Sequence, residues 1–241
     1  MRKYHAAAAS DRGKKRGDNQ DYYGYSLDAG VFVVCDGMGG VSGGALASHI
    51  TVDTVLHSVD SSSGHCCREQ LEAAIRTGNR EVYRRSQAEP RYSGMGTTLV
   101  ALAIEGGHVW VANIGDSRCY RFRNGALEQL TQDHSLVEAQ IQMGRMTAAQ
   151  AERSPLRNVI TRAVGTQPEV LADITEYEAE PGDIFLLASD GLTKELCQEE
   201  ICSLMAKSSL HPATRCLQLV AAANQAGGRD NITCLIVQVI G

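Results

Sequence analysis

The stretch Val31-Phe32-Val33-Val34-Cys35-Asp36-Gly37-Met38-Gly39-Gly40 runs an apolar segment into an aspartate within a glycine-rich turn. Short apolar runs bounded by glycine are typical of buried strands. Val109–Ile114 runs in the same way toward Asp116, and Ile184–Ala188 runs toward Asp190. Strands that end like this deliver their carboxylates to one rim of a sheet.

Two further aspartates stand in similar turns, Asp21 after Asn19-Gln20 and Asp230 before Asn231. Several unpaired carboxylates brought together repel one another and lose hydration, so a shared rim implies that cations neutralise them. Oxygen ligands are the choice of hard divalent ions. The sequence therefore predicts bound magnesium or manganese.

Asp36 is the best candidate to bridge two ions, because Gly37 has no side chain and lets its carbonyl oxygen approach a metal closely. Asp190 and Asp230 are then expected to complete the coordination of one ion. Arg16 lies five residues before Asp21 and presents a planar fork that matches phosphate oxygens. The alternative for Arg16 is a solvated surface group.

A chain of 241 residues with 43% hydrophobic content can form one large domain, here residues 1–241. The net charge of −5 disfavours nucleic acids and anionic membranes as partners, although Lys14-Lys15-Arg16 can bind one phosphate. The apolar part of the start, Met1–Ser10, is too short for a signal peptide, and no stretch could span a bilayer. We expect a cytoplasmic protein, and its eight cysteines, which lack metal-ligand spacing, to be reduced thiols.

Apolar runs and turn residues predict an α+β arrangement of stacked sheets with helices outside. Glu105-Gly106-Gly107 and Asn124-Gly125 suit tight hairpins, so the strands beside them are antiparallel. Helical periodicity appears at Val52–Val59 and Leu71–Val82, and again around Ile201–Met205 and at Leu217, Val220 and Ala221. The predicted strands are Val31–Val34, Thr98–Ile104, His108–Ile114, Arg118–Arg123, Ala126–Leu130, Ile184–Ala188 and Ile232–Val239.

The segment Ser135–Pro155 contains few strand formers and separates two groups of strands. Thr147-Ala148-Ala149-Gln150 offers a capping-box start for a short helix. We interpret the segment, about residues 135–155, as a surface flap near the metal rim. A plain structural connection is the alternative.

The motifs, taken in order, resemble those of the metal-dependent protein phosphatases of the PP2C (PPM) type in their compact bacterial form. The resemblance covers nearly the whole chain, and the ordered set is far more specific than any one piece. The matching segments are Arg16 with Asn19-Gln20-Asp21, Asp36-Gly37-Met38-Gly39-Gly40, Gly96-Thr97-Thr98, Gly115-Asp116-Ser117-Arg118, Thr131-Gln132-Asp133-His134-Ser135, Ile160-Thr161-Arg162-Ala163-Val164-Gly165, Ser189-Asp190-Gly191-Leu192 and Gly228-Arg229-Asp230-Asn231.

This resemblance implies a four-layer α-β-β-α sandwich of two antiparallel sheets flanked by helices, with a binuclear Mn²⁺ or Mg²⁺ centre at one end. By motif matching, one ion is held by Asp36, Asp190 and Asp230, and the second by Asp36 and the Gly37 carbonyl. A third ion matches Asp116 with Asp190. The resemblance also implies that Asp21 orients metal-bound waters and that Arg16 binds the substrate phosphate.

Two positions depart from the family pattern. Gln20 stands where many members have a glutamate, which removes a negative charge and weakens the expected hold on the second ion. Met38 stands where animal-type members have a histidine proposed as the general acid. We hypothesise that the third ion supplies the water that protonates the leaving group instead.

Other conspicuous residues have structural interpretations. The motif that contains His134 is mainly structural in the family, and Arg118 and Arg162 are expected to be buried ion-pair partners. Gly96-Thr97-Thr98 lacks the lysine of a P-loop and is interpreted as a turn. Trp110, inside a strand, is expected in the core.

The leading functional hypothesis is hydrolysis of phosphoserine or phosphothreonine on proteins by metal-activated water. A catalytically silent binding module on the same fold and a hydrolase of small phosphoesters are the alternatives. By resemblance, the expected partners are phosphorylated proteins, a cognate Ser/Thr kinase or a phosphorylated forkhead-type scaffold. No heptad or large apolar face is visible, which favours a monomer.

Overall fold

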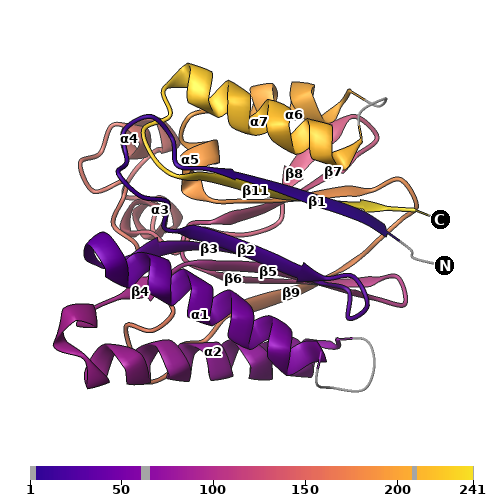
Figure 1. Ribbon diagram of the computed structural model, residues 1–241. Helices are drawn as coiled ribbons and strands as arrows, with labels where there is room; N and C mark the ends of the chain where they lie inside the picture. The colour runs from indigo at the N-terminus through magenta and orange to yellow at the C-terminus, as the bar shows by residue number, and fades with distance from the viewer. Residues whose placement is uncertain (1–3, 61–65, 208–210, 241) are drawn as a thin grey trace.

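Two antiparallel sheets lie face to face in the computed structural model, which describes residues 4–60, 66–207 and 211–240 (Figure 1). One sheet has the order β1-β11-β10-β7-β8, and the other has the order β2-β3-β5-β6-β9 with β4 paired to β3. The strands are β1 (Tyr4–Asp11), β2 (Asp21–Ser26), β3 (Val31–Met38), β4 (Gly96–Thr97), β5 (Leu99–Glu105), β6 (His108–Ile114), β7 (Arg118–Arg123), β8 (Ala126–Gln129), β9 (Asp173–Glu178), β10 (Ile184–Ala188) and β11 (Ile232–Val239).

Helices cover the outer face of each sheet, so the chain forms four layers (Figure 1). The long helices α1 (Gly40–Asp60) and α2 (Arg68–Ala88) lie against the β2-β3-β5-β6-β9 sheet, and α6 (Gln198–Met205) and α7 (Pro212–Ala226) lie against the other. The remaining helices are the short α3 (Leu136–Gln142), α4 (Ala148–Glu152), α5 (Asp190–Thr193) and the 3-10 turn η1 (Pro90–Tyr92). The predicted α+β sandwich of two antiparallel sheets is confirmed.

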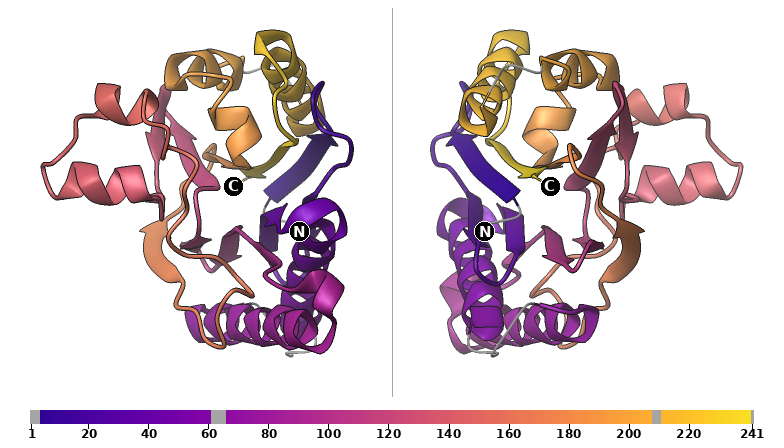
Figure 2. Two further views of the ribbon diagram at one scale, coloured as in Figure 1. Left: turned by 90° about the vertical axis from the view of Figure 1, so that its left-hand side faces the viewer. Right: turned by 90° about the vertical axis from the view of Figure 1, so that its right-hand side faces the viewer.

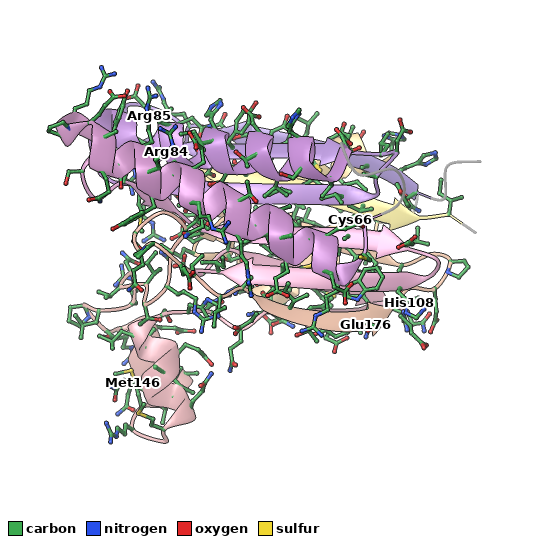
Figure 3. All side chains as sticks on the ribbon, turned by 90° about the horizontal axis from the view of Figure 1, so that it is seen from below. Cys66, Arg84, Arg85, His108, Met146 and Glu176 are labelled. Atoms are coloured by element: carbon green, nitrogen blue, oxygen red, sulfur yellow. The ribbon has the colours of Figure 1, made fainter. Side chains whose placement is uncertain are left out.

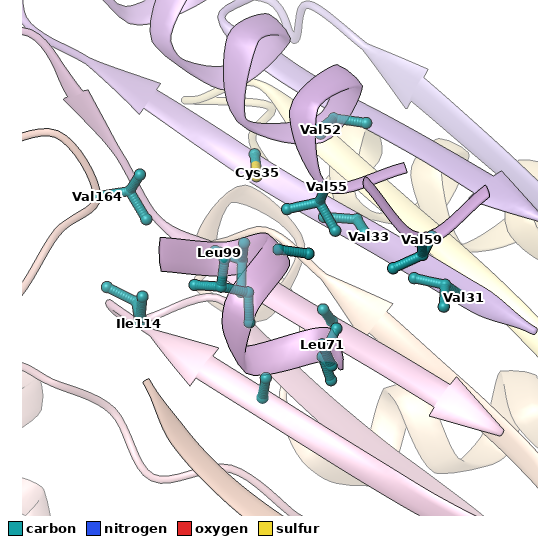
Figure 4. Packing of buried hydrophobic residues seen from close by; sticks show 14 of the residues in the cluster. Val31, Val33, Cys35, Val52, Val55, Val59, Leu71, Leu99, Ile114 and Val164 are labelled. Atoms are coloured by element: carbon teal, nitrogen blue, oxygen red, sulfur yellow. The ribbon is translucent and has the colours of Figure 1, made fainter. Parts of the chain in front are cut away.

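The sequence of strand β3 is apolar at every position from Val31 to Cys35 rather than alternating, and the place of the strand in the fold explains this. Val31, Val33 and Cys35 pack beneath α1 and α2, as Figure 4 shows, whereas Phe32 and Val34 point into the space between the sheets. Both faces of a central strand in a four-layer fold are covered, so both sets of side chains are fully buried. This burial fixes the register that carries Asp36 to the end of the strand.

Four strands were missed by the sequence prediction, and one of them is the two-residue β4 within Gly96-Thr97-Thr98, which had been interpreted as a turn. Strand β1 is rich in alanine, which favours strands weakly, and it forms because it pairs with β11 along its whole length, from Tyr4↔Val239 to Asp11↔Ile232. It uses residues of the apolar start, whereas residues 1–3 lie outside the described chain. Strand β2 carries glycine and three tyrosines, and β9 has four exposed residues out of six, so neither shows a clear apolar face.

Two core assignments need correction. Leu217 and Ala221 do not lie on the buried face of α7: Leu217 is 64% exposed, and the helix instead buries Cys216, Leu219 and Ala223. Trp110 is only partly buried: it packs against the hydrophobic cluster beneath α1 and α2, and its ring stacks on that of His108 with the ring centroids 5.9 Å apart. His108 also pairs with Glu176 of β9 on the outer edge of the sheet (Figure 3).

The segment from residue 135 to 155 projects from the sandwich as a pair of short helices (Figure 2). Its tip, near Met146, lies well away from the sheets (Figure 3). Thr147 caps α4 through the predicted capping box with Gln150. Helix α3 was missed, although Ser135 followed by Glu138 is an N-terminal signal of the same kind, and the Ser135 side chain accepts a hydrogen bond from the Glu138 amide.

Two further findings concern the sequence expectations, and a third concerns an ion pair outside the cavity. None of the eight cysteines forms a disulfide. Within the described residues, no helix is both long enough and apolar enough to cross a bilayer. Away from the turns that carry the aspartates, the buried Asp183 binds the guanidinium of Arg123 through two hydrogen bonds of 2.6 and 2.7 Å, which fastens β7 to the turn before β10.

Candidate metal centre

A cavity of about 670 Å³ opens at the end of the sandwich where β3, β6, β10 and the turn before β11 finish. Seven of the eight predicted site residues line it: Arg16, Gln20, Asp36, Gly37, Asp116, Asp190 and Asp230. The eighth, Asp21, is buried and is the strand partner of Asp36 in the β2–β3 pairing. The expectation that these turns meet at one rim therefore agrees with the fold.

Hydrogen bonds from neighbouring turns fix the backbone on which Asp36 stands. The Asp36 amide donates to the Thr98 hydroxyl at 3.0 Å, and the Asp36 carbonyl accepts from the Thr97 hydroxyl at 2.8 Å and from the Thr98 amide at 2.9 Å. The Thr98 hydroxyl is bonded in turn to Ser117 at 2.7 Å. Gly96-Thr97-Thr98 is thus more than a turn, because its hydrogen bonds hold the backbone of Asp36, which lines the cavity.

The neighbouring Asp21 is held from the opposite sheet. Its Oδ2 accepts a hydrogen bond of 2.7 Å from the hydroxyl of Ser189, the residue before Asp190. Its Oδ1 is buried and has no hydrogen-bond partner among the described residues, and the same is true of Asp190 Oδ1. Two buried carboxylate oxygens without donors are strongly unfavourable unless a cation or ordered water completes their environment.

The cavity is electrostatically unfavourable for carboxylates that lack a bound cation. Burial, reinforced by the charges of Asp190 and Asp230, raises the pKa of Asp21 to about 7. Burial and the charge of Asp190 likewise raise the pKa of Asp116 to about 7. Burial and repulsion from Asp21 raise the pKa of Asp36 well above its usual range. These shifts have the direction expected of carboxyl groups in a site built for positive charge.

Two basic side chains supply part of that charge in this structure. Arg16 donates to Asp230 Oδ2 at 2.7 Å, and Lys194 contacts Asp190 and lies 3.8 Å from Asp116 Oδ2. With the carboxylates held in these pairs, no three acidic, histidine or cysteine side chains in the described chain surround one point as a finished ligand set. The donor set nevertheless fits a hard divalent cation, because Asp21 Oδ1 and Asp190 Oδ1, the two unpartnered oxygens of the site residues, are both carboxylate oxygens.

Gly37 has a role beyond the one predicted for it. A side chain at this position would collide with the carbonyl of Gly44 in α1 and would lie 2.7 Å from the carbonyl of Gln20. The end of β3 therefore packs directly on the start of α1. Gln20 joins the same contact, because its side-chain amide donates to the Gly40 carbonyl at 2.8 Å, a bond that a glutamate could not make.

Asn231 is a site residue whose role the sequence interpretation missed. Its side-chain oxygen accepts from the Gln20 amide at 2.8 Å, and its side-chain nitrogen donates to the carbonyls of Arg12 and Asp18 at 2.9 Å each. One buried amide thus ties the loop that carries Arg16 to the turn that carries Asp230. Its adjacency to Asp230 was the only available signal.

Three residues with structural interpretations have partners consistent with them. His134 accepts from the Gly115 amide at 3.1 Å and its other ring nitrogen lies 2.9 Å from Asp173. Arg118 forms the expected ion pair, with Asp133 at 2.7 Å, but its side chain is only partly buried. Arg162 pairs with Asp173 at 2.6 Å but is half-exposed rather than buried, because this pair lies at the open edge of β9.

Fold and cavity together define a class, the metal-dependent phosphatases built on a double antiparallel sheet. The sequence model of the protein phosphatase 2C family matches residues 12–226. The chain therefore belongs to this family.

Relatives and solved structures agree with that assignment. The chain is 37% identical over 236 residues to the serine/threonine protein phosphatase PstP of Mycobacterium tuberculosis, a match that covers 97% of this chain and 45% of PstP. It is 37% identical over 241 residues to the protein phosphatase PhpP of Streptococcus pneumoniae, covering 95% of each. The chain thus spans about half the length of PstP. The solved catalytic domain of PstP in complex with two manganese ions is 34% identical and superimposes with a TM-score of 0.89 over 99% of both chains.

Proposed function

We propose that this protein hydrolyses phosphoserine and phosphothreonine on proteins, using water activated by bound divalent cations. The observation that carries the proposal is the convergence of Asp36, Asp116, Asp190 and Asp230 with Arg16 in one cavity. Relatives named as serine/threonine protein phosphatases across nearly the whole chain support the same activity. The two manganese ions of the PstP catalytic domain support Mn²⁺ as the cofactor, with Mg²⁺ as the alternative.

The proposed ligand assignment is the one that the resemblance to the PP2C family implies. Asp36, Asp190 and Asp230 hold one ion, and Asp36 with the Gly37 carbonyl holds the second. Divalent ions held by these residues would activate water for attack on phosphorus and would offset the negative charge that develops in the transition state. A third ion at Asp116 and Asp190 would have to compete with Lys194.

The remaining residues position and orient groups in this proposal. Asp21, fixed by Ser189, accepts hydrogen bonds from water in the cavity through its unpartnered Oδ1. The guanidinium of Arg16 lines the cavity and has four donors beyond the one given to Asp230 Oδ2. Those donors suit two oxygens of the substrate phosphate.

The wider setting is part of the same proposal. Residues 1–241 act as one monomeric, cytoplasmic phosphatase domain that reverses the action of a cognate Ser/Thr kinase on phosphorylated proteins. The segment 135–155 is a surface flap near the rim of the cavity. Asn158 and Ile160, which follow that segment, line the cavity and support this role.

The test is phosphate release from a phosphothreonine peptide, measured with and without Mn²⁺ for the wild type, Asp190→Asn and the control Asp60→Asn. We expect Mn²⁺-dependent turnover that only Asp190→Asn abolishes. A folded, Mn²⁺-loaded protein that releases no phosphate would refute the proposal in favour of a silent binding module. Faster turnover of nucleotides than of phosphopeptides would refute the assigned substrate class.

A further inference from the structure

Lys194 places a positive charge inside the acidic cavity. It follows α5, and its amide donates to the Asp190 carbonyl at 2.8 Å, so the two residues lie one helical turn apart on the same face. Its ammonium contacts Asp190 Oδ2 and lies 3.8 Å from Asp116 Oδ2. Lys194 lines the cavity and keeps 35% of its side chain exposed.

The ammonium of Lys194 lies beside the two carboxylates that were expected to bind a third divalent ion. Asp116 and Asp190 are the two residues assigned to a third ion, and both are buried. Among the described residues, Lys194 is the only basic side chain within 4.0 Å of either of them. The other basic group of the cavity, Arg16, is bound to Asp230 instead.

We propose that the ammonium of Lys194 is a resident, tethered cation of the Asp116–Asp190 pair, and that a third divalent ion binds only by displacing it. This inference rests on the proposed metal centre and adds a regulatory property to it. A tethered cation faces its carboxylates at a high effective concentration and is not diluted away. The two ions at Asp36, Asp190 and Asp230 remain compatible with it, because Asp190 has a second, unpartnered oxygen.

The consequence is a chain with two tight ion sites and one weak site. Displacing Lys194 removes one positive charge from two carboxylates, so the third ion gains less net attraction than it would at an empty pair. The exposed stem gives the ammonium a route to solvent when it leaves. Occupancy of the third site then depends on the free Mn²⁺ concentration.

The test counts bound ions and does not depend on turnover. Mn²⁺ bound per chain is measured by equilibrium dialysis with metal analysis, over a range of free Mn²⁺, for the wild type, Lys194→Met and Lys194→Gln. Lys207→Met is the matched control, because it removes the same charge from an exposed position outside the cavity. Circular dichroism verifies the fold of each variant, and the second substitution at Lys194 keeps the test valid where the first misfolds.

We expect two tight ions in the wild type and in Lys207→Met, with a third ion at least about tenfold tighter in both Lys194 variants, a difference of about 1.4 kcal/mol. Adding Asp116→Asn to Lys194→Met should abolish that tighter third site. Equal third-ion affinity in the wild type and the Lys194 variants would overturn the inference while leaving the phosphatase proposal intact. Failure of every form to bind Mn²⁺ would overturn both.

Discussion

Replacing Asn231 by alanine removes three hydrogen bonds at once from the base of the cavity. They join its side chain to the Gln20 amide at 2.8 Å and to the carbonyls of Arg12 and Asp18 at 2.9 Å each. Asn231 is 5% exposed, so water cannot fully replace these bonds. At about 0.5–1.5 kcal/mol each, their loss should lower the free energy of unfolding by roughly 2–4 kcal/mol.

That loss should be visible in two measurements. Urea unfolding in the presence of a chelator gives the free-energy difference directly, and thermal unfolding should show a decrease in Tm of roughly 5–15 °C. Because the freed loop carries Arg16, we also expect KM for a phosphothreonine peptide to rise.

Asn224→Ala is the matched control for this experiment. Asn224 makes one exposed hydrogen bond of 3.0 Å to Asp11, so its loss should cost less than about 1 kcal/mol and leave KM unchanged. The free energies of unfolding of Asn231→Ala and Asn224→Ala could differ by less than about 1 kcal/mol while Asn231→Ala binds substrate normally. In that case the assignment of Asn231 as the residue that joins the two loops is wrong.

Gly37→Ala should weaken Mn²⁺ binding at least about tenfold in the dialysis assay, because the added methyl group forces β3 away from α1. Gly17→Ala is the control: position 17 has open space around it, so this variant should bind Mn²⁺ normally. Asp183→Asn should lower the urea-derived free energy of unfolding by about 2–4 kcal/mol, since it unpairs a buried ion pair, while kcat stays at the wild-type value. Metal-free protein should gain stability as the pH falls from about 8 to about 5.5. The native pKa values of Asp21 and Asp116, about 7, exceed those of the unfolded chain, so the native state takes up more protons over this range. A Tm that decreased as the pH fell would contradict these pKa shifts. Mn²⁺ affinity should fall over the same interval, as calorimetry can measure, since binding must release these protons.

The parts of the fold that sequence could predict are those with a continuous apolar run or a helical period. Strand β3 is apolar from Val31 to Cys35 because both of its faces are covered, and β10 follows the same rule. Strand β1 could not be found in this way, because its alanines become a strand only through pairing with β11. The buried face of α7 was assigned one position away from the true one, since Leu217 is apolar yet exposed.

The candidate site could be predicted further than the strands, because aspartates in glycine-bounded turns keep a local signature. Asp36, Asp116 and Asp190 reach one cavity for the reason given by the sequence, each following an apolar strand. Asn231 and Lys194 carry no such signature. Their roles depend on which carbonyl or carboxylate lies within reach once distant turns have met.

The pairing of β1 with β11 also sets the order of events when the polypeptide is made. Arg16 and Asp21 leave the ribosome early, whereas Asp230 and β11 leave about two hundred residues later. Until then β1 and β10 lack the strand that lies between them in the sheet. Unpaired strand edges of this kind invite association with other chains. The nascent protein therefore passes through a stage in which it is prone to aggregate and cannot yet hold its ions, and both conditions end together when β11 inserts.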